Sequence, residues 1–567
     1  MVFLIFILII DILFIGWSLN MIKKNLKKNK LIDGAFIVTI SIIITKILGI
    51  LYVIPFYSII GEKGGALYSY AYTIYTFFMS IAVSGIPLAI SKLVSEYQTL
   101  GYYRSKVQVF RIAKILSFTL GFFIFLLLYF LSPVISKMII GKAGGGNSLN
   151  DIVWSIRIIS FAIIIVPLLS VYRGYFEGHR FMNPPSISQV LEQLFRVMII
   201  LLGCFLSIKI LPLKFSNLVY ISLVAVSIGA IVSYLYLVYQ MKKNSRKFHE
   251  KIRDVGEPII SNTIMLKKIL VYSIPFIMID FFKGTFNYID MFTVIKGLSK
   301  YFSSADAEII FSIMSTWASK FHMVLLAFTS GICLSLIPNL TESIVKKNNK
   351  SIQNNINQSF SILAFIIFPM TMGISFLAKP IWFLFYGNSN YGPSILSYSI
   401  FIGLFFSFFY LIMNILQVYK GFRYIFICLI SGIIFKLLFN TRLMISFSNV
   451  HLAPYHGAIT ASIIGFIICI SIGMIILRKN YSVLFDNILK NIVDILCGSI
   501  FMIFGLCILK LFIPISSSIR IYNLFIIIFY GSFGALLYFL YGKYTNLISS
   551  IFGNKVYQVI KKSFIRS

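Results

Sequence analysis

The chain has 567 residues, of which 59% are hydrophobic and only 12% carry a charge. No soluble core could bury so large a share of apolar side chains, so the composition excludes a soluble enzyme. Lys and Arg number 50 against 17 Asp and Glu, which gives a net charge of +33. Because most of these basic residues flank apolar runs, they indicate a membrane topology and not a nucleic-acid partner.

The apolar residues form fifteen runs, each long enough for the helix of about 20 residues that crosses a bilayer. The alternating pattern of a membrane β-barrel is absent. The sequence therefore predicts an all-α polytopic membrane protein with 14 core transmembrane helices, preceded by an extra helix within residues 1–22. That first run lacks the basic start and the cleavage pattern of a signal peptide. Translation from Met21 is the alternative, and it would leave a fourteen-helix protein.

Lys and Arg are divided unevenly between alternate loops. The loops on one side carry 33 of them, and the loops on the other side carry 11. Basic loops remain in the cytoplasm, so the richer side is predicted to be cytoplasmic. We therefore expect a multi-pass protein of the cell membrane whose basic tail, residues 546–567, is cytoplasmic.

An internal repeat relates two parts of the chain. Residues 84–96 share five identities with residues 330–342 at an offset of 246, and Gly178, Arg180, Ser188 and Leu194 recur at an offset of 243. The offset spans six helices, an even number, so the two halves have the same orientation and a site is expected at their interface. The predicted divisions are a six-helix N-lobe, a basic cytoplasmic linker, a six-helix C-lobe and two additional helices, at residues 31–241, 242–267, 268–480 and 486–545.

Three lysines, Lys46, Lys283 and Lys320, lie near the middle of predicted helices. A charge at that depth costs at least about 2.5 kcal/mol, which makes each of them a functional candidate. Asp280, Lys283, Asn287 and Asp290 are three or four residues apart, so they share one helical face. Together these residues predict an aqueous substrate-binding cavity with a cationic floor, able to accept phosphate oxygens. The alternative for each lysine is a salt bridge or a snorkelled side chain.

Four other charged residues are candidates for gating. Glu96 and Glu342 are equivalent in the repeat and end their helices on the basic side, where they could pair with nearby loops. Solvation of the helix ends is the alternative. Glu192 and Arg196 are four residues apart, which predicts an ion pair within one helix. Lys436 and Asn440 repeat that spacing in the second half.

The sequence contains neither GxxxxGK[ST] nor a GxGxxG that follows a strand, so the chain itself is not expected to hydrolyse ATP. We predict no catalytic residue, no metal site and no cofactor. Any transport would depend on Na⁺ or H⁺ coupling, or on the membrane potential.

Several motifs together resemble a known family. The segment Lys46-Ile47-Leu48-Gly49-Ile50-Leu51-Tyr52 precedes Ser84-Gly85-Ile86-Pro87, and Tyr172-Arg173-Gly174-Tyr175 and Pro338-Asn339-Leu340-Thr341-Glu342 follow. This combination resembles the polysaccharide transporter and lipid II flippase branch of the multidrug/oligosaccharidyl-lipid/polysaccharide exporter superfamily. Stage V sporulation protein B is a close variety within it. The resemblance extends from about residue 31 to the C-terminus.

The resemblance implies a V-shaped pair of lobes that moves an undecaprenyl-pyrophosphate-linked saccharide, such as a lipid II-like precursor or a polysaccharide repeat unit, by alternating access. It also implies cavity-lining bases in the first, second and eighth core helices. Lys46 matches the first and Lys320 lies close to the last, whereas Phe77-Phe78-Met79 offers no base in the second. The expected partners are the lipid-linked oligosaccharide, membrane lipids and cell-wall synthesis proteins, with no nucleic acid and a monomeric transport unit.

Three other functions compete with this interpretation. A cation-coupled multidrug exporter of the same superfamily usually has twelve helices and depends on carboxylates within the membrane. A major-facilitator transporter has parallel six-helix repeats but lacks these motifs. A non-transporting scaffold for cell-wall synthesis would need no polar cavity.

The charge bias gives a direct test of topology. A reporter fused after Ser567 should lie in the cytoplasm. The loops on the same side of the membrane as the C-terminus carry 33 basic residues, whereas the loops on the opposite side carry 11. Paired reporters, one active in the cytoplasm and one active outside, would measure this. An external C-terminus would show that the helix count or the orientation is wrong.

Overall fold

The computed structural model describes residues 41, 45, 48–49, 51–83, 85–140, 146–209, 213–244, 260–515 and 519–552. Within these ranges the regular structure is helical, without strands, and twelve helical segments are long and apolar enough to cross a membrane. The predicted all-α polytopic class is confirmed, and the number of 14 core helices stays a prediction. The run within residues 1–22, most of the 242–267 linker and the end of the 546–567 tail lie outside the described residues.

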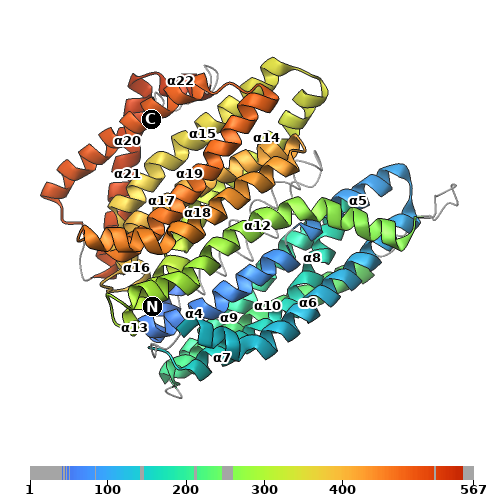
Figure 1. Ribbon diagram of the computed structural model, residues 1–567, viewed down its shortest axis with the longest axis horizontal. Coiled ribbons are helices and arrows are strands. Elements are labelled where there is room, and N and C mark those ends of the chain that lie inside the picture. The colour runs from blue at the N-terminus through green and yellow to red at the C-terminus, as the bar shows by residue number, and fades with distance from the viewer. Residues whose placement is uncertain are drawn as a thin grey trace.

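Figure 1 shows two groups of roughly parallel helices. The first group consists of α4 (Val53–Ala82), α5 (Ile86–Leu100), α6 (Tyr103–Ile140), α7 (Leu149–Ser160), α8 (Ala162–Gly178), α9 (Asn183–Lys209) and α10 (Phe215–Lys243). The second consists of α13 (Ser304–Ser312), η1 (Ile313–Trp317), α14 (Ser319–Val345), α15 (Asn349–Phe376), α16 (Ala378–Tyr386), α17 (Gly392–Val418), α18 (Phe422–Asn449) and α19 (Pro454–Tyr481). Beyond them follow α20 (Asp486–Phe512), α21 (Arg520–Tyr544) and α22 (Leu547–Phe552).

The two groups are packed in the same way, as a duplicated fold requires. In the first, α9 packs on α10, and α8 packs on α5, α6 and α10. In the second, α18 packs on α19, and α17 packs on α14, α15 and α19. Each packed pair of helices in the first group therefore corresponds to a packed pair in the second group that has the same place in the helix order. The α20 and α21 pair is added at the outer edge of the second group, against α15 and α16 (Figure 1).

Helix α12 (Asn262–Leu298) lies between the two groups in Figure 1 and contacts both of them. It packs on α4, α5 and α6 of the first group and on α18 and α19 of the second. The close approach to α5 depends on Gly85, which has φ +83° and lies against the backbone carbonyl of Ser273. A side chain at position 85 would be strained by the positive φ and would also collide with that carbonyl.

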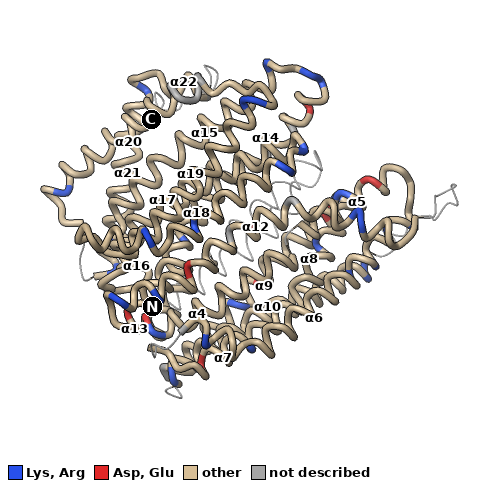
Figure 2. Tube along the Cα trace, viewed as in Figure 1, with Lys and Arg blue, Asp and Glu red and all other residues tan. Residues whose placement is uncertain are grey.

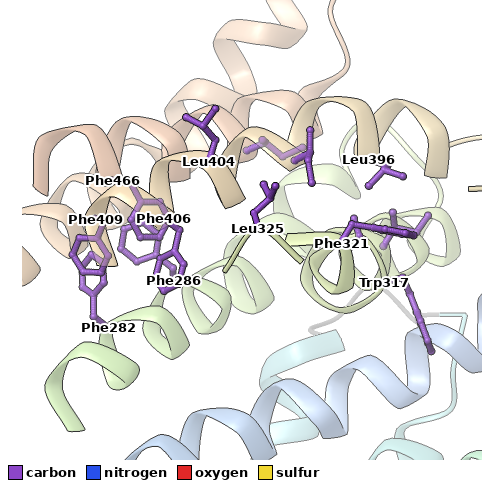
Figure 3. Packing of buried hydrophobic residues seen from close by; sticks show 14 of the residues in the cluster. Phe282, Phe286, Trp317, Phe321, Leu325, Leu396, Leu404, Phe406, Phe409 and Phe466 are labelled. Atoms are coloured by element: carbon purple, nitrogen blue, oxygen red, sulfur yellow. The ribbon is translucent and has the colours of Figure 1, made fainter. Parts of the chain in front are cut away.

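Aromatic side chains fill much of the interior of the second group. Figure 3 shows Phe282 and Phe286 of α12 facing Phe406, Phe409 and Phe466. The Phe282 and Phe409 rings are 5.2 Å apart, and the Phe286 and Phe466 rings are 4.9 Å apart. This packing fixes the second half of α12 against α17 and α19. In Figure 2 most charged positions lie towards the helix ends, and a few lie within the bundle.

The repeat supplies a matched pair of glycine substitutions. Gly85→Ala should lower stability by about 1–3 kcal/mol, because it adds a Cβ at a positive φ and against the carbonyl of Ser273. Its repeat equivalent Gly331 lies inside α14 with open space around the added Cβ, so Gly331→Ala should be neutral or stabilising, within about 1 kcal/mol. Thermal unfolding of the purified protein measures both. Equal effects of the two substitutions would contradict this account of the α5 and α12 contact.

Candidate functional site

A large cavity lies between the two groups of helices. Its volume is about 1040 Å³, and its walls come from α4, α9, α12, η1, α14, α17 and α19. The polar side chains that line it include Arg196, Lys320, Asp280, Asn287, Asp290, Gln193 and His322. This volume is at the upper end of the range for small-molecule sites, so the cavity can hold a substantial polar headgroup.

One end of the cavity is closed by aromatic rings from both groups. Trp317 packs edge-on against Tyr57 with ring centroids 4.8 Å apart, and Tyr57 contacts Tyr386 at 4.9 Å. The Tyr386 hydroxyl donates to the Trp317 carbonyl oxygen at 2.9 Å. Figure 3 shows Trp317 extending from its own helix towards the blue helix α4. We call Tyr57, Trp317 and Tyr386 the aromatic seal.

Beside this seal the two halves make contact through equivalent residues. The hydroxyl of Ser69 in α4 is 2.9 Å from that of Ser315 in η1, and these positions differ by the repeat offset of 246. Ser69 also hydrogen-bonds Thr316 at 2.5 Å. A residue can touch its own repeat equivalent only near the axis that relates the halves. The pseudo-two-fold axis therefore passes beside the closed end of the cavity.

The cavity extends from the seal towards the end of the bundle that carries the α5–α6 and α14–α15 connections. Along α14 the lining residues run from Lys320 to Phe328, and along α12 they run back from Asp290 to Asp280. The residues farthest from the seal, Asp280, Ala327 and Phe328, are exposed. The cavity is therefore closed at the α13 and α16 end and accessible from the opposite end, which we call the basic end.

Lys320 lies at the inner limit of the cavity, next to the seal. Its ammonium donates to the Tyr52 hydroxyl at 3.4 Å and lies 4.9 Å from the Tyr52 ring and 5.0 Å from the Trp317 ring. These contacts are cation–π interactions, since the ring faces carry partial negative charge. No carboxylate within 4 Å neutralises Lys320 among the described residues. Its charge is therefore free to act on an anion in the cavity.

Arg196 of α9 enters the same cavity from the first group. Its Nη2 donates to the Tyr68 hydroxyl at 2.9 Å, and its guanidinium lies 5.6 Å from the Tyr72 ring. Tyr68 and Tyr72 are stacked, with centroids 5.4 Å apart. The Nε of Arg196 is buried and has no hydrogen-bond partner within the part of the chain that the structure describes. A second cation thus lines the cavity, with its Nε buried in the wall.

The predicted substrate-binding residues are placed as follows. Lys320, Asp280, Asn287 and Asp290 line one cavity, so the spacing in α12 does direct its polar residues to a common space. Asp280 is exposed, whereas Asp290 is 8% exposed and forms an ion pair with Lys436 at 2.8 Å. Lys46 lies outside the described residues, and Lys283 lies in α12 with a side chain that is not described. Substrate binding by these residues stays a prediction.

The predicted pair of Glu192 and Arg196 is wrong. Glu192 accepts from Arg173 of α8 at 2.8 Å, and Arg173 also donates to Ser188 at 2.9 Å and to Ser233 at 3.2 Å. A neighbouring helix offers Glu192 a better-placed guanidinium than its own helix does. Arg196, released from that pair, binds Tyr68 instead. The gating role expected for Glu192 and Arg196 stays untested.

The two glutamates predicted to gate lie at the basic end. Glu342 is exposed and pairs with Lys346 at the end of its own helix, where the hydrogen bond from Lys346 lowers the pKa of the Glu342 carboxyl. Glu96 is half-buried in α5. Neither lines the cavity. A gating role for either glutamate remains a prediction.

The site also contains aromatic residues that sequence reasoning missed. Tyr52, Tyr68 and Tyr72 contact the two cations, and Trp317 joins Lys320 to the seal. The four-residue spacing of Tyr68 and Tyr72 was the available signal, since it places both rings on one helical face. In a chain with 16% aromatic residues, however, such spacing is common.

Comparisons with known proteins identify relatives of the chain. A family model described as Polysaccharide biosynthesis protein matches residues 31–338. The chain is 29% identical over 484 residues to the lipid II flippase MurJ of Bacillus subtilis (strain 168), covering 84% of this chain and 87% of that protein. It is also 29% identical over 175 residues to stage V sporulation protein B of the same organism, covering 30% of this chain and 32% of that protein.

Solved structures with the same fold come from two kinds of transporter. The lipid II flippase MurJ in an inward closed conformation matches with a TM-score of 0.63 and 17% identity, over 90% of this chain and 100% of that chain. An inward-facing multidrug resistance MATE transporter of the MOP superfamily matches with a TM-score of 0.59 and 13% identity, over 77% and 96%. These identities are low, so the structural matches establish the fold of a polytopic transporter.

The revised pairing of Glu192 is testable by double-mutant cycles. Arg173→Gln and Glu192→Gln should show a coupling energy of about 0.5–3 kcal/mol, because their charges are in contact at 2.8 Å. Arg196→Gln and Glu192→Gln should be additive. Unfolding of the four variants of each cycle in denaturing detergent measures the coupling. If only Glu192 and Arg196 showed a coupling energy, the pairing of these two residues within one helix would be correct after all.

Proposed function

Because the chain belongs to the polysaccharide biosynthesis protein family, we propose that it flips an undecaprenyl-pyrophosphate-linked saccharide to the outer leaflet of the cell membrane by alternating access. The saccharide is a lipid II-like cell-wall precursor or a polysaccharide repeat unit. The observation that carries the proposal is the cavity between the two halves, in which Lys320 and Arg196 face a common space.

The two cations suit a pyrophosphate. A diphosphate that leaves water needs opposite charge and hydrogen-bond donors in its place. Lys320 offers an ammonium without a carboxylate partner among the described residues, and Arg196 offers a guanidinium on the wall of the same cavity. Lys46 and Lys283 belong to this proposal as further bases, on the basis of their position in the sequence. Asp280 would limit the net positive charge and so allow release, whereas Asp290 is already neutralised by Lys436.

The aromatic rings suit the sugar. Tyr52, Tyr68 and Tyr72 lie beside the cations on the cavity wall. Their flat apolar faces can pack on the C–H faces of a saccharide ring, while their hydroxyl groups can exchange hydrogen bonds with the sugar. The polyprenyl tail would remain in the lipid, because the cavity contains many polar groups and the bundle surface is apolar.

The access geometry suits loading from the cytoplasm. The cavity is accessible from the basic end, and the loops at that end carry most of the Lys and Arg residues. If these loops are cytoplasmic, the structure is an inward-facing state with the aromatic seal on the outer side. Outward release then requires separation at the seal and closure at the basic end.

A multidrug exporter of the same superfamily is the main alternative. An exporter for organic cations would present carboxylates to its substrate without competing bases. Here Asp290 is paired with Lys436, and two cations face the cavity. This balance of charge favours an anionic substrate.

Substitution of the cavity cations tests the mechanism. Lys320→Ala, Arg196→Ala and Lys46→Ala should each lower outer-leaflet exposure of the lipid-linked precursor at least about tenfold, a loss of ~1.4 kcal/mol or more in transition-state stabilisation. Lys320→Arg should retain part of the activity, since the charge remains but its shape and hydration change. The measurement is the amount of precursor accessible to an external reagent in cells that depend on the variant.

Arg157→Gln is the matched control, because Arg157 is a cation of α7 that bonds the Tyr129 carbonyl and Ser132 and does not line the cavity. It should leave flipping unchanged at equal membrane level.

In the same cells, depletion of the protein should cause one lipid-linked saccharide to accumulate on the inner leaflet, which identifies the substrate. Normal exposure in the Lys46→Ala, Lys320→Ala double variant would refute the cationic cavity and favour a scaffold.

A further inference from the structure

A second group of polar residues lies behind the cavity wall in the second half of the molecule. Lys436 of α18 is fully buried, and its ammonium contacts three oxygen atoms. These are Asp290 Oδ1 of α12 at 2.8 Å, the Ala458 carbonyl oxygen of α19 at 2.9 Å and Ser462 Oγ of α19 at 2.6 Å. An ammonium has three N–H donors, so every donor of Lys436 is used.

A neighbouring amide supports the Asp290 carboxylate. Asn440 of α18 is fully buried and donates to Asp290 Oδ1 at 2.9 Å and to Thr293 Oγ1 at 2.6 Å. Its own amide oxygen is buried and has no hydrogen-bond partner among the described residues. A carboxylate, a carbonyl and a hydroxyl oxygen thus converge on the Lys436 ammonium, and the Asn440 amide group holds the carboxylate from the side. Oxygen ligands of this kind are those that hard metal cations prefer.

The arrangement differs from an ordinary surface ion pair in two respects. It is buried, so removal of the ammonium would leave the Asp290 carboxylate uncompensated, and deleting one partner of a buried pair is strongly destabilising. It also joins three helices that come from different parts of the chain, α12, α18 and α19. A cation at this position therefore stabilises the packing of these three helices.

The place also borders the transport cavity. Asp290, Ser462, Ile459 and Phe466 line the cavity on one side, and Lys436 lies on the other side of Asp290 and Ser462. If the Lys436 side chain were shortened, an ion could enter its place from the cavity. Access and ligands are both present, and only the ammonium occupies the position.

We propose that Lys436 is a built-in cation that fills a site for a monovalent metal ion, so that its removal converts the cluster of Asp290, Ala458 and Ser462 oxygens into a Na⁺ site. In the natural chain this cluster is saturated and binds no diffusible cation. The three helices are therefore clamped at all times, independently of the Na⁺ concentration. This inference concerns ion binding alone and does not depend on the proposed substrate.

The test compares thermal unfolding of the purified full-length protein in NaCl, KCl and choline chloride at equal ionic strength. The natural protein should unfold at the same temperature in NaCl and choline chloride. Lys436→Ala should be less stable in choline chloride and should regain several degrees in a saturable way with NaCl, because a ligand that binds only the folded state stabilises it. Radioactive Na⁺ should bind to Lys436→Ala with about one ion per chain and not to the natural protein.

Three variants complete the design. Lys436→Asn vacates the same space and adds an oxygen, so it should bind Na⁺ as well and provides the test if Lys436→Ala does not fold. Lys436→Met fills the space with an uncharged chain of similar length, so it should be destabilised without any response to Na⁺. Adding Asp290→Asn to Lys436→Ala should abolish Na⁺ binding.

Several results would overturn the proposal. A Na⁺ response of the natural protein would show that the site is not filled by Lys436. Folded Lys436→Ala and Lys436→Asn that both fail to bind Na⁺ would show a purely structural ion pair. An equal response in Lys436→Met would show that the ion binds elsewhere. Flipping activity enters none of these measurements, so failure here leaves the proposed function standing.

Discussion

The structure depends on one constraint: a charge within the thickness of a membrane has no bulk water to hydrate it and must be satisfied by the protein. Among the described residues, Arg173 and Lys436 meet this requirement with a carboxylate and further oxygen atoms. Arg173 is held by Glu192 and two serines between α8, α9 and α10, and Lys436 is held by Asp290 and two other oxygens between α12, α18 and α19. Each cluster fixes helices that hydrophobic packing alone would leave free to slide, since lipid and side chains are equally apolar.

Lys320 and Arg196, the cations of the cavity, have fewer hydrogen-bond partners than Arg173 and Lys436. Lys320 has one long hydrogen bond of 3.4 Å and two ring faces, and Arg196 has one hydrogen bond and one ring. Neither contacts a carboxylate within the described part of the chain. Tyrosine and tryptophan stabilise a cation without neutralising it, so its field remains available. Within the described part of the chain, the two cavity cations thus have aromatic partners, whereas the two cations between packed helices have carboxylate partners.

The sequence was sufficient for the class of fold, because apolar runs of membrane length and loop charge follow directly from the bilayer. It also indicated that Asp280, Asn287 and Asp290 share a space, since helical spacing is regular. Partners across helices could not be predicted in the same way. Glu192 has Arg196 one turn away in sequence, yet it binds Arg173 from another helix, and Asp290 binds Lys436 from 146 positions further on. Such choices depend on helix packing, which a single sequence does not specify.

The contact between Ser69 and Ser315 marks the axis that relates the two halves, and the charges of the cavity do not follow this symmetry. In a dimer of identical half-length chains, any residue beside the two-fold axis would appear twice, and a lysine that faced the centre would face its own copy. At the offset of 246, the counterpart of Lys320 is Ile74, a buried apolar residue. Once the two halves belong to one chain, equivalent positions can carry different residues. The axis survives in the serine contact, while Lys320 places on one half of the cavity wall a positive charge that the equivalent position of the other half does not repeat.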